Sequence, residues 1–282
     1  MSRIFDTHVH IDKYAVPEPE RLLRSMDEHK IDKVALLAED PEYTMEKDLN
    51  KCREYNEARL KRLKEWCDGS DGRLVPIYYI NPVERDAMDQ AKKAVDAGCA
   101  GFKVICETHY PGDERAMPVY QLIADMGKSI LFHSGILWDW GDNGNYNRPC
   151  NWECMMNIRN AKFALAHISW PWTDECLSVY GKFTMMWDHP SYQNQVMHID
   201  LTPGTPLCYR QEVLTTIHDT AYWGIENRML FGSDAFTSTF DGAFIANWAR
   251  NDTEMLLAAG YDQATVDKVL YDNAMAFWGL KD

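Results

Sequence analysis

The chain has 282 residues, of which 46% are hydrophobic, and its 43 acidic and 29 basic residues give a formal net charge of −14. This length can bury a core without disulfides or other covalent staples. The acidic balance, with no local cluster of lysine or arginine, argues against nucleic acid and anionic membrane surfaces as partners. The acidity says nothing specific about the substrate, which the motifs described below indicate to be a small-molecule substrate.

The eight cysteines are scattered and form no CxxC pair, and no basic and then apolar leader precedes Ile4. No apolar run approaches the ~20 residues that a membrane-spanning helix needs. These features predict a cytoplasmic protein with reduced thiols. The sequence is compatible with a homodimer but does not determine the oligomeric state.

In chain order, predicted strands and helices alternate from the N-terminus onward. Helical periodicity predicts helices at 20–29, 42–67, 83–97, 117–126, 152–160, 173–180 and 211–223, followed by terminal helices. Apolar runs predict strands at 3–10, 33–38, 73–79, 100–105, 129–133, 162–167, 196–201 and 228–234.

These strands are continuously apolar, which is typical of parallel strands buried on both faces. Eight strand–helix units in ~250 residues are enough to close a barrel. The sequence therefore predicts an α/β fold, a single (β/α)8 TIM barrel that spans 1–282 as one domain. A doubly wound open sheet is the structural alternative.

The first strand ends in His8-Val9-His10. Side chains alternate faces along a strand, so His8 and His10 project the same way and can share one metal ion. Taken alone, such a pair could also be a tag remnant or a solvated turn.

Later strands carry further polar residues near their carboxyl ends: Lys103, His133, His167 and Asp234. The carboxyl ends of parallel barrel strands open onto one face, so these side chains should converge with His8 and His10. Each could be a satisfied structural residue by itself, but their joint position predicts a metal site.

The segments Asp6–His10, Gly101–Val104, Leu131–Gly135, Leu165–His167 and Phe231–Asp234 resemble the strand-end motifs of the amidohydrolase superfamily. The resemblance covers nearly the whole chain. It is greatest to the amidohydrolase-related branch of small hydrolases and of decarboxylases similar to aminocarboxymuconate semialdehyde decarboxylase.

The resemblance implies that His8, His10, His133 and Asp234 hold one divalent metal ion, with zinc expected and manganese as the alternative. It implies that His167 stands beside the metal-activated water as a general acid/base or carbonyl polariser. Asp234 would accept the proton of that water.

Lys103 leaves the number of metal ions open. In dihydroorotase-like members a lysine in a similar segment is carboxylated and bridges two metals, and the sixth-strand histidine, here His167, becomes a ligand. In many single-metal relatives the lysine is only a neighbour. The lack of a second obvious acidic bridge favours one metal.

The loop after the fifth predicted strand contains Trp138, Trp140, Tyr146 and Arg148. We predict that the three aromatic rings wall a flat or ring-shaped substrate and that Arg148 binds its carboxylate, because a guanidinium matches that group bidentately. The alternative is an ordinary surface loop. Other residues placed to reach substrate, without a ranking, are Glu107, His109, Tyr209 and Arg210. No cysteine receives a catalytic role, because the sequence assigns none of them a histidine partner.

These inferences favour a metal-dependent hydrolase of a small carboxylate-bearing lactone, amide or vinylogous acid. In that reaction His167 would stabilise the oxyanion and Asp234 would move the proton. The alternative is a nonoxidative decarboxylase of an aromatic or dienoic acid at the same site, with His167 or Asp234 protonating the carbon. A noncatalytic metal-binding barrel is the third class, which the complete set of ligand positions disfavours.

Overall fold

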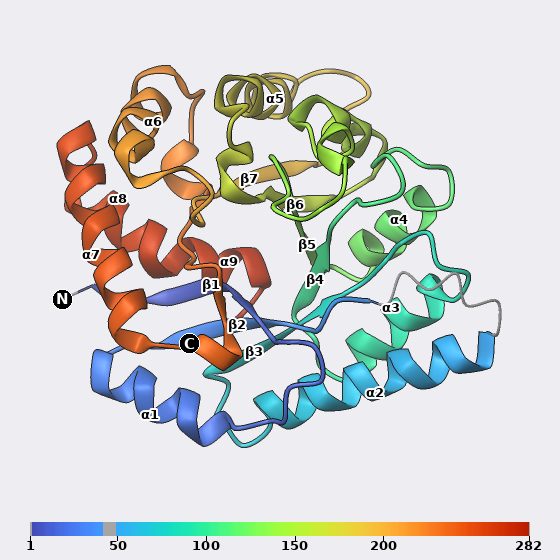
Figure 1. Ribbon diagram of the computed structural model, residues 1–282. Coiled ribbons are helices and arrows are strands. Elements are labelled where there is room, and N and C mark those ends of the chain that lie inside the picture. The colour runs from blue at the N-terminus through green and yellow to red at the C-terminus, as the bar shows by residue number, and fades with distance from the viewer. Residues whose placement is uncertain (1, 42–48, 282) are drawn as a thin grey trace.

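A computed structural model describes residues 2–41 and 49–281. Within these residues, nine parallel strands form one sheet with the order β8-β7-β6-β5-β4-β3-β2-β1-β9 (Figure 1). The strands are β1 Phe5–His10, β2 Lys33–Leu37, β3 Leu74–Tyr79, β4 Gly101–Val104, β5 Ser129–Phe132, β6 Lys162–Leu165, β7 Val196–Asp200, β8 Met229–Leu230 and β9 Ala235–Phe236.

The two edge strands are neighbours in sequence, because only residues 231–234 separate β8 from β9. β8 pairs with β7, whereas β9 pairs with β1. The connecting segment also pairs with β1, because the Thr7 amide donates a hydrogen bond of 3.0 Å to the Phe231 carbonyl. The sheet therefore curls into a TIM-barrel-like α/β fold. Within the strand predicted at 228–234, the structure has only Met229–Leu230 as β8, and residues 231–234 connect it to β9, which lies beyond the predicted range.

Helices surround the sheet on its outer side (Figure 1). The described α-helices are α1 Pro19–His29, α2 Leu49–Cys67, α3 Ala87–Asp96, α4 Met117–Asp125, α5 Thr173–Met185, α6 Leu207–Thr220, α7 Gly242–Ala259, α8 Gln263–Asp267 and α9 Asn273–Trp278. The part of the predicted helix 42–67 that precedes Leu49 lies outside the described residues. None of the helices within 2–41 and 49–281 has both the length and the apolarity to cross a bilayer.

The α-helix predicted at 152–160 is wrong in type. The structure has a 3-10 helix at Pro149–Asn157 instead. Asn151 uses its side-chain amide to donate to the carbonyls of Asn145 and Tyr146. These two bonds connect the first turn of the 3-10 helix to the turn that precedes it.

α9 seals the end of the sheet where the strands begin. Its Phe277 and Trp278 pack against inward-facing side chains such as Phe5 and Leu131, and the Phe277 carbonyl accepts a hydrogen bond from the Ser129 hydroxyl. A Cβ atom at Gly101 would lie 2.3 Å from the Trp278 ring, so glycine permits this close approach. The amino ends of the strands are therefore apolar and covered, and polar side chains gather at the opposite end.

Candidate metal centre

β1 places His8 and His10 side by side. The Nε2 atoms of the two rings lie 3.2 Å apart. The buried His8 Nδ1 lies 2.7 Å from Asp200 Oδ2 at the end of β7. Because a carboxylate accepts, Nδ1 of His8 carries the hydrogen and Nε2 keeps its lone pair toward His10. A carboxylate behind a ligating imidazole is a common second layer of metal sites.

Asp234 completes a three-residue group with these histidines. Its Oδ1 lies 3.5 Å from His8 Nε2 and 3.4 Å from His10 Nε2. Burial alone raises the pKa of Asp234, but hydrogen bonding to His10 and the electrostatic influence of the surrounding histidine rings outweigh it, so the pKa lies well below its usual range. Asp234 is therefore an ionised carboxylate, the form that binds a cation.

Local backbone features hold Asp234 in place. Its φ of 59° lies in the left-handed region, which costs energy for a non-glycine residue. Just before it, the Ser233 amide and hydroxyl donate to the buried carboxylate of Asp6 at 2.9 and 2.5 Å. A Cβ atom at Gly232 would lie 2.4 Å from the Thr202 hydroxyl, so glycine lets this segment pack against the turn after β7.

His133 and His167 follow β5 and β6 directly, and their ring centres lie 4.9 Å apart. His133 Nε2 is buried and has no hydrogen-bond partner within the described part of the chain. His167 Nδ1 lies 3.1 Å from the Pro203 carbonyl. Since a carbonyl only accepts, Nδ1 of His167 carries the hydrogen, and Nε2 of the neutral ring is unprotonated.

Strained backbone orients His167. The residue begins three consecutive left-handed conformations, with φ of 60° at His167, 51° at Ile168 and 55° at Ser169. A Cβ atom at Gly204 would lie 2.7 Å from His167 Cβ, so glycine allows the loop after β7 to approach the ring. Such strain persists where the surroundings fix a side chain in one position, and it is enriched at functional sites.

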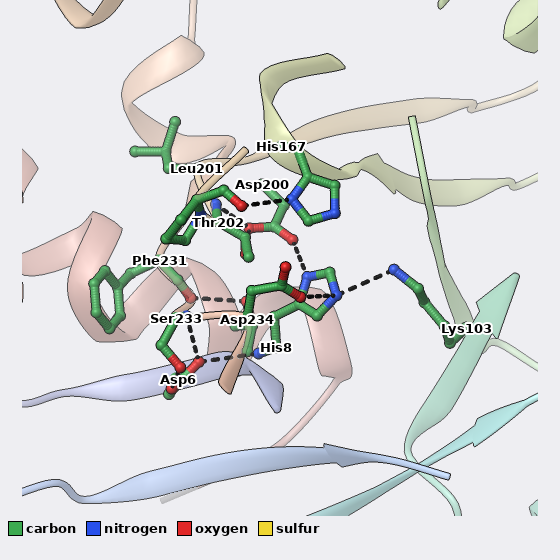
Figure 2. A network of polar contacts seen from close by, with 12 residues as sticks. Asp6, His8, Lys103, His167, Asp200, Leu201, Thr202, Phe231, Ser233 and Asp234 are labelled. Atoms are coloured by element: carbon green, nitrogen blue, oxygen red, sulfur yellow. Dashed lines mark hydrogen bonds and ion pairs between the residues drawn. The ribbon is translucent and has the colours of Figure 1, made fainter. Parts of the chain in front are cut away.

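Lys103 points from β4 toward the His8 ring, as Figure 2 shows. Its Nζ lies 3.1 Å from His8 Nε2. Burial lowers the pKa of the amine to about 8, opposed by the charges of Asp234 and Asp200.

This donor set fits a divalent metal ion. His8, His167 and Asp234 offer ligand atoms that all lie within 4.8 Å of one another, and His10 is within 3.4 Å of the Asp234 carboxylate. Burial lowers the pKa of His8, His133 and His167, so these rings are neutral, the form that ligates metals. The unpartnered Nε2 of His133 is a buried nitrogen that a metal ion would satisfy.

The family model for amidohydrolases matches residues 5–280. The chain belongs to the amidohydrolase family. A search of curated proteins finds no significant match.

Several solved structures share the fold of this amidohydrolase. 2,6-Dihydroxybenzoate decarboxylase in complex with 2,6-dihydroxybenzoate is 14% identical, with a TM-score of 0.70 over 99% of each chain. 5-Carboxyvanillate decarboxylase from Novosphingobium aromaticivorans, with bound manganese, is 11% identical, with a TM-score of 0.66 over 99% of this chain and 97% of that one. Dihydroorotase from Campylobacter jejuni is 14% identical, with a TM-score of 0.61 over 100% of this chain and 85% of that one.

A cavity of about 670 Å³ opens above His10 and Asp234 of this amidohydrolase. Its lining includes His10, Lys103, His133, His167 and Asp234, and its walls are largely apolar and aromatic. The remaining lining residues are Asp40, Tyr79, Ile105, Glu107, Ile136, Leu137, Trp138, Asp139, Trp170, Pro203, Gly204, Thr205, Pro206 and Phe236.

The four substrate-binding residues predicted in the loop after β5 lie in different places. Trp138 lines the cavity. Trp140 is fully exposed and is not part of the lining. Tyr146 is not part of the lining either, and its ring packs edge-on against Tyr110 at 4.9 Å between centroids. Arg148 also lies outside the lining. Its Nε is 2.8 Å from Glu175 Oε2, and its guanidinium lies over Trp172.

The four further residues that the sequence placed near the substrate also lie in different surroundings. Glu107 lines the cavity, and Tyr209 stacks on Trp170 in the wall. Arg210 is buried in an ion pair with Asp252, with 2.6 Å between Nε and Oδ1.

His109 lies 3.5 Å from the Cys106 sulfur, so the structure gives this cysteine the histidine partner that the sequence alone could not assign. Burial raises the pKa of the Cys106 thiol, which keeps it protonated and unreactive.

Sequence reasoning noted Asp6 only as part of the first motif and missed Asp200, and it gave a role to neither of these two buried carboxylates behind the site. Asp200 accepts from His8, and the Thr202 amide donates to its other oxygen at 2.7 Å. The available signal was its position, because Asp200 ends β7 as His10 ends β1. An acidic residue near the carboxyl end of an apolar strand should have joined the candidates.

Proposed function

We propose that the protein is a metal-dependent nonoxidative decarboxylase of an aromatic or dienoic acid. The observation that carries the proposal is the group formed by His8, His10 and Asp234 at the base of a cavity with aromatic walls. A flat acid can fill such a cavity with its carboxylate directed at the metal-binding residues. The likeness to two decarboxylases of substituted benzoates, over nearly the whole of each chain, supports this reaction.

His8, His10, His133 and Asp234 are the residues that we propose to hold the ion. Three imidazoles and one carboxylate suit zinc by their donor chemistry, and manganese is the alternative, since it is bound in the 5-carboxyvanillate decarboxylase structure. When bound, the ion acts as a Lewis acid on the substrate's oxygen atoms. We also propose that the sheet closes fully as an eight-stranded barrel, with β8 and β9 as parts of one strand.

His167 is the proposed proton carrier. Its Nδ1 hydrogen is engaged by the Pro203 carbonyl, which leaves Nε2 to take up a proton and release it. In the reaction the bond to the carboxylate breaks, carbon dioxide leaves, and the electron pair stays on the carbon. That carbon then takes the proton from His167, which is replenished from solvent. The ionised Asp234 serves as ligand and as electrostatic partner of the histidines.

Hydrolysis is the second candidate function, and the position of Lys103 favours it. The lysine amine lies 3.1 Å from His8 Nε2, near enough to the metal-binding group to take part in a two-metal site. The structural likeness to dihydroorotase is consistent with that chemistry.

A substrate panel on metal-replete protein separates the two functions. We expect carbon dioxide from at least one hydroxybenzoate or muconate, and loss of this activity after treatment with a chelator. Hydrolysis of lactones or amides without any release of carbon dioxide would replace the decarboxylase by the hydrolase. Elemental analysis of the same preparation gives the identity and number of the metal ions.

A further inference from the structure

Lys103 is the one lysine or arginine among the described residues that line the cavity. Its side chain is fully buried, and its amine lies beside the metal-binding group. Outside that group, the charged side chains of the lining are the carboxylates of Asp40, Glu107 and Asp139, which repel an anion. A carboxylate that enters the cavity therefore finds one cationic side chain, at the base.

The contact between Lys103 and His8 depends on the state of the site. Within the described residues, the one hydrogen-bond partner of the Lys103 amine is His8 Nε2, at 3.1 Å. Because Asp200 holds the hydrogen of His8 on Nδ1, this bond uses the lone pair of Nε2. The same lone pair is the one that His8 offers to a metal ion. When this lone pair binds a metal ion, the buried ammonium of Lys103 loses its acceptor. It then needs another one, since an unpaired buried charge is costly.

We infer that Lys103 positions the carboxylate of the substrate, with its amine donating to a carboxylate oxygen at the base of the cavity. The inference rests on the proposed function, because it requires a carboxylate substrate. It transfers to Lys103 the role that the sequence assigned to Arg148, whose guanidinium is engaged by Glu175 outside the cavity. Lys103 thus favours acids over neutral analogues of the same shape.

The test measures ligand binding instead of turnover. Manganese-loaded wild type and Lys103→Met are titrated by calorimetry with 2,6-dihydroxybenzoate and with the neutral 2,6-dihydroxybenzamide. Methionine keeps a long unbranched side chain and removes the charge. We expect the wild type to prefer the acid. The variant should lose about tenfold or more in affinity for the acid, the loss of a charge-assisted hydrogen bond, while its affinity for the amide stays within about twofold.

Controls separate this role from a structural one. Arg148→Met removes a cation outside the cavity and should leave both affinities unchanged. Metal content and thermal unfolding show whether Lys103→Met keeps the site and the fold. Lys103→Gln, which retains a donor without charge, is the second variant if methionine prevents folding.

An acid-to-amide affinity ratio that is equal in wild type and both Lys103 variants would overturn the inference. So would a wild type that does not bind the acid, or a second equivalent of metal that disappears with Lys103→Met, because the lysine would then bridge two ions. Release of carbon dioxide from the substrate panel tests the proposed function separately. The inference on Lys103 and the proposed function can therefore fail independently.

Discussion

The sequence predicts site residues both at the strand ends and in the loop after β5, but the structure places the two sets in opposite surroundings. His8 and Asp200 at strand ends are fully buried and hydrogen-bonded to each other. In the loop, Trp138 and Trp140 have exposed fractions of 83% and 107%, and Arg148 forms a surface ion pair. Side chains whose direction is fixed by the sheet converge, whereas those on the loop largely face solvent. Substitutions should therefore have large effects at the strand ends and small effects in the loop.

The largest effect is expected from Asp234→Asn. The substitution keeps the shape of the side chain and removes the charge that faces His8 and His10. We expect turnover, measured as carbon dioxide release, to fall by more than roughly 1000-fold, because both metal binding and charge balance at the site depend on this carboxylate. The thermal unfolding midpoint should change little.

Asp142→Asn is the matched control for Asp234→Asn. It removes one exposed carboxylate from the loop after β5 and should leave turnover at the wild-type level. An Asp234→Asn protein that kept a tenth of the wild-type rate would contradict the proposed role of Asp234.

His167→Gln tests proton transfer apart from metal binding by the proposed four ligands. Glutamine can still donate to the Pro203 carbonyl but cannot carry a proton to the substrate. We expect kcat to fall by about 10²–10⁴, the usual contribution of a general acid, while the metal content stays near that of the wild type. Loss of one metal equivalent together with activity would instead identify His167 as a ligand in a two-metal site.

Asp200→Asn should have an intermediate effect, because Asp200 acts through His8. Without the charge of Asp200, the tautomer of His8 with its hydrogen on Nδ1 is less strongly favoured. Metal affinity should therefore fall by about 10–100-fold. Competition with a chelator of known affinity measures this change. Activity at saturating metal should largely recover, and failure to recover would show that Asp200 does more than orient His8.

The same comparison explains what the sequence could and could not predict. Periodicity and apolar runs located the strand ends, since a strand dictates which way its side chains point. His8, His10, His133, His167, Lys103 and Asp234 could therefore be grouped before any coordinates. Asp200 was overlooked because it lies outside the segments that resemble the strand-end motifs, although its position at the end of β7 obeys the same rule.

Other features depend on contacts that no local pattern encodes. Closure of the amino end by α9 requires Trp278 to meet Gly101, which lies far away in sequence. The 3-10 helix at Pro149–Asn157 is connected to the preceding turn by side-chain bonds from Asn151, which helical periodicity does not encode. The direction of Arg148 is set by Glu175 on α5, so its chemical suitability for a carboxylate did not predict where it points.

The smallest effect is expected from Arg148→Gln. The guanidinium is about half exposed and pairs with Glu175 at 2.8 Å, so the substitution removes a surface ion pair of low energetic value. We expect kcat and KM for an accepted acid to stay within about twofold of the wild type, in contrast to the weakened acid binding of Lys103→Met. A rise in KM of tenfold or more with unchanged kcat would show that the loop rearranges and brings Arg148 onto the substrate. The loop would then share substrate binding with the strand ends.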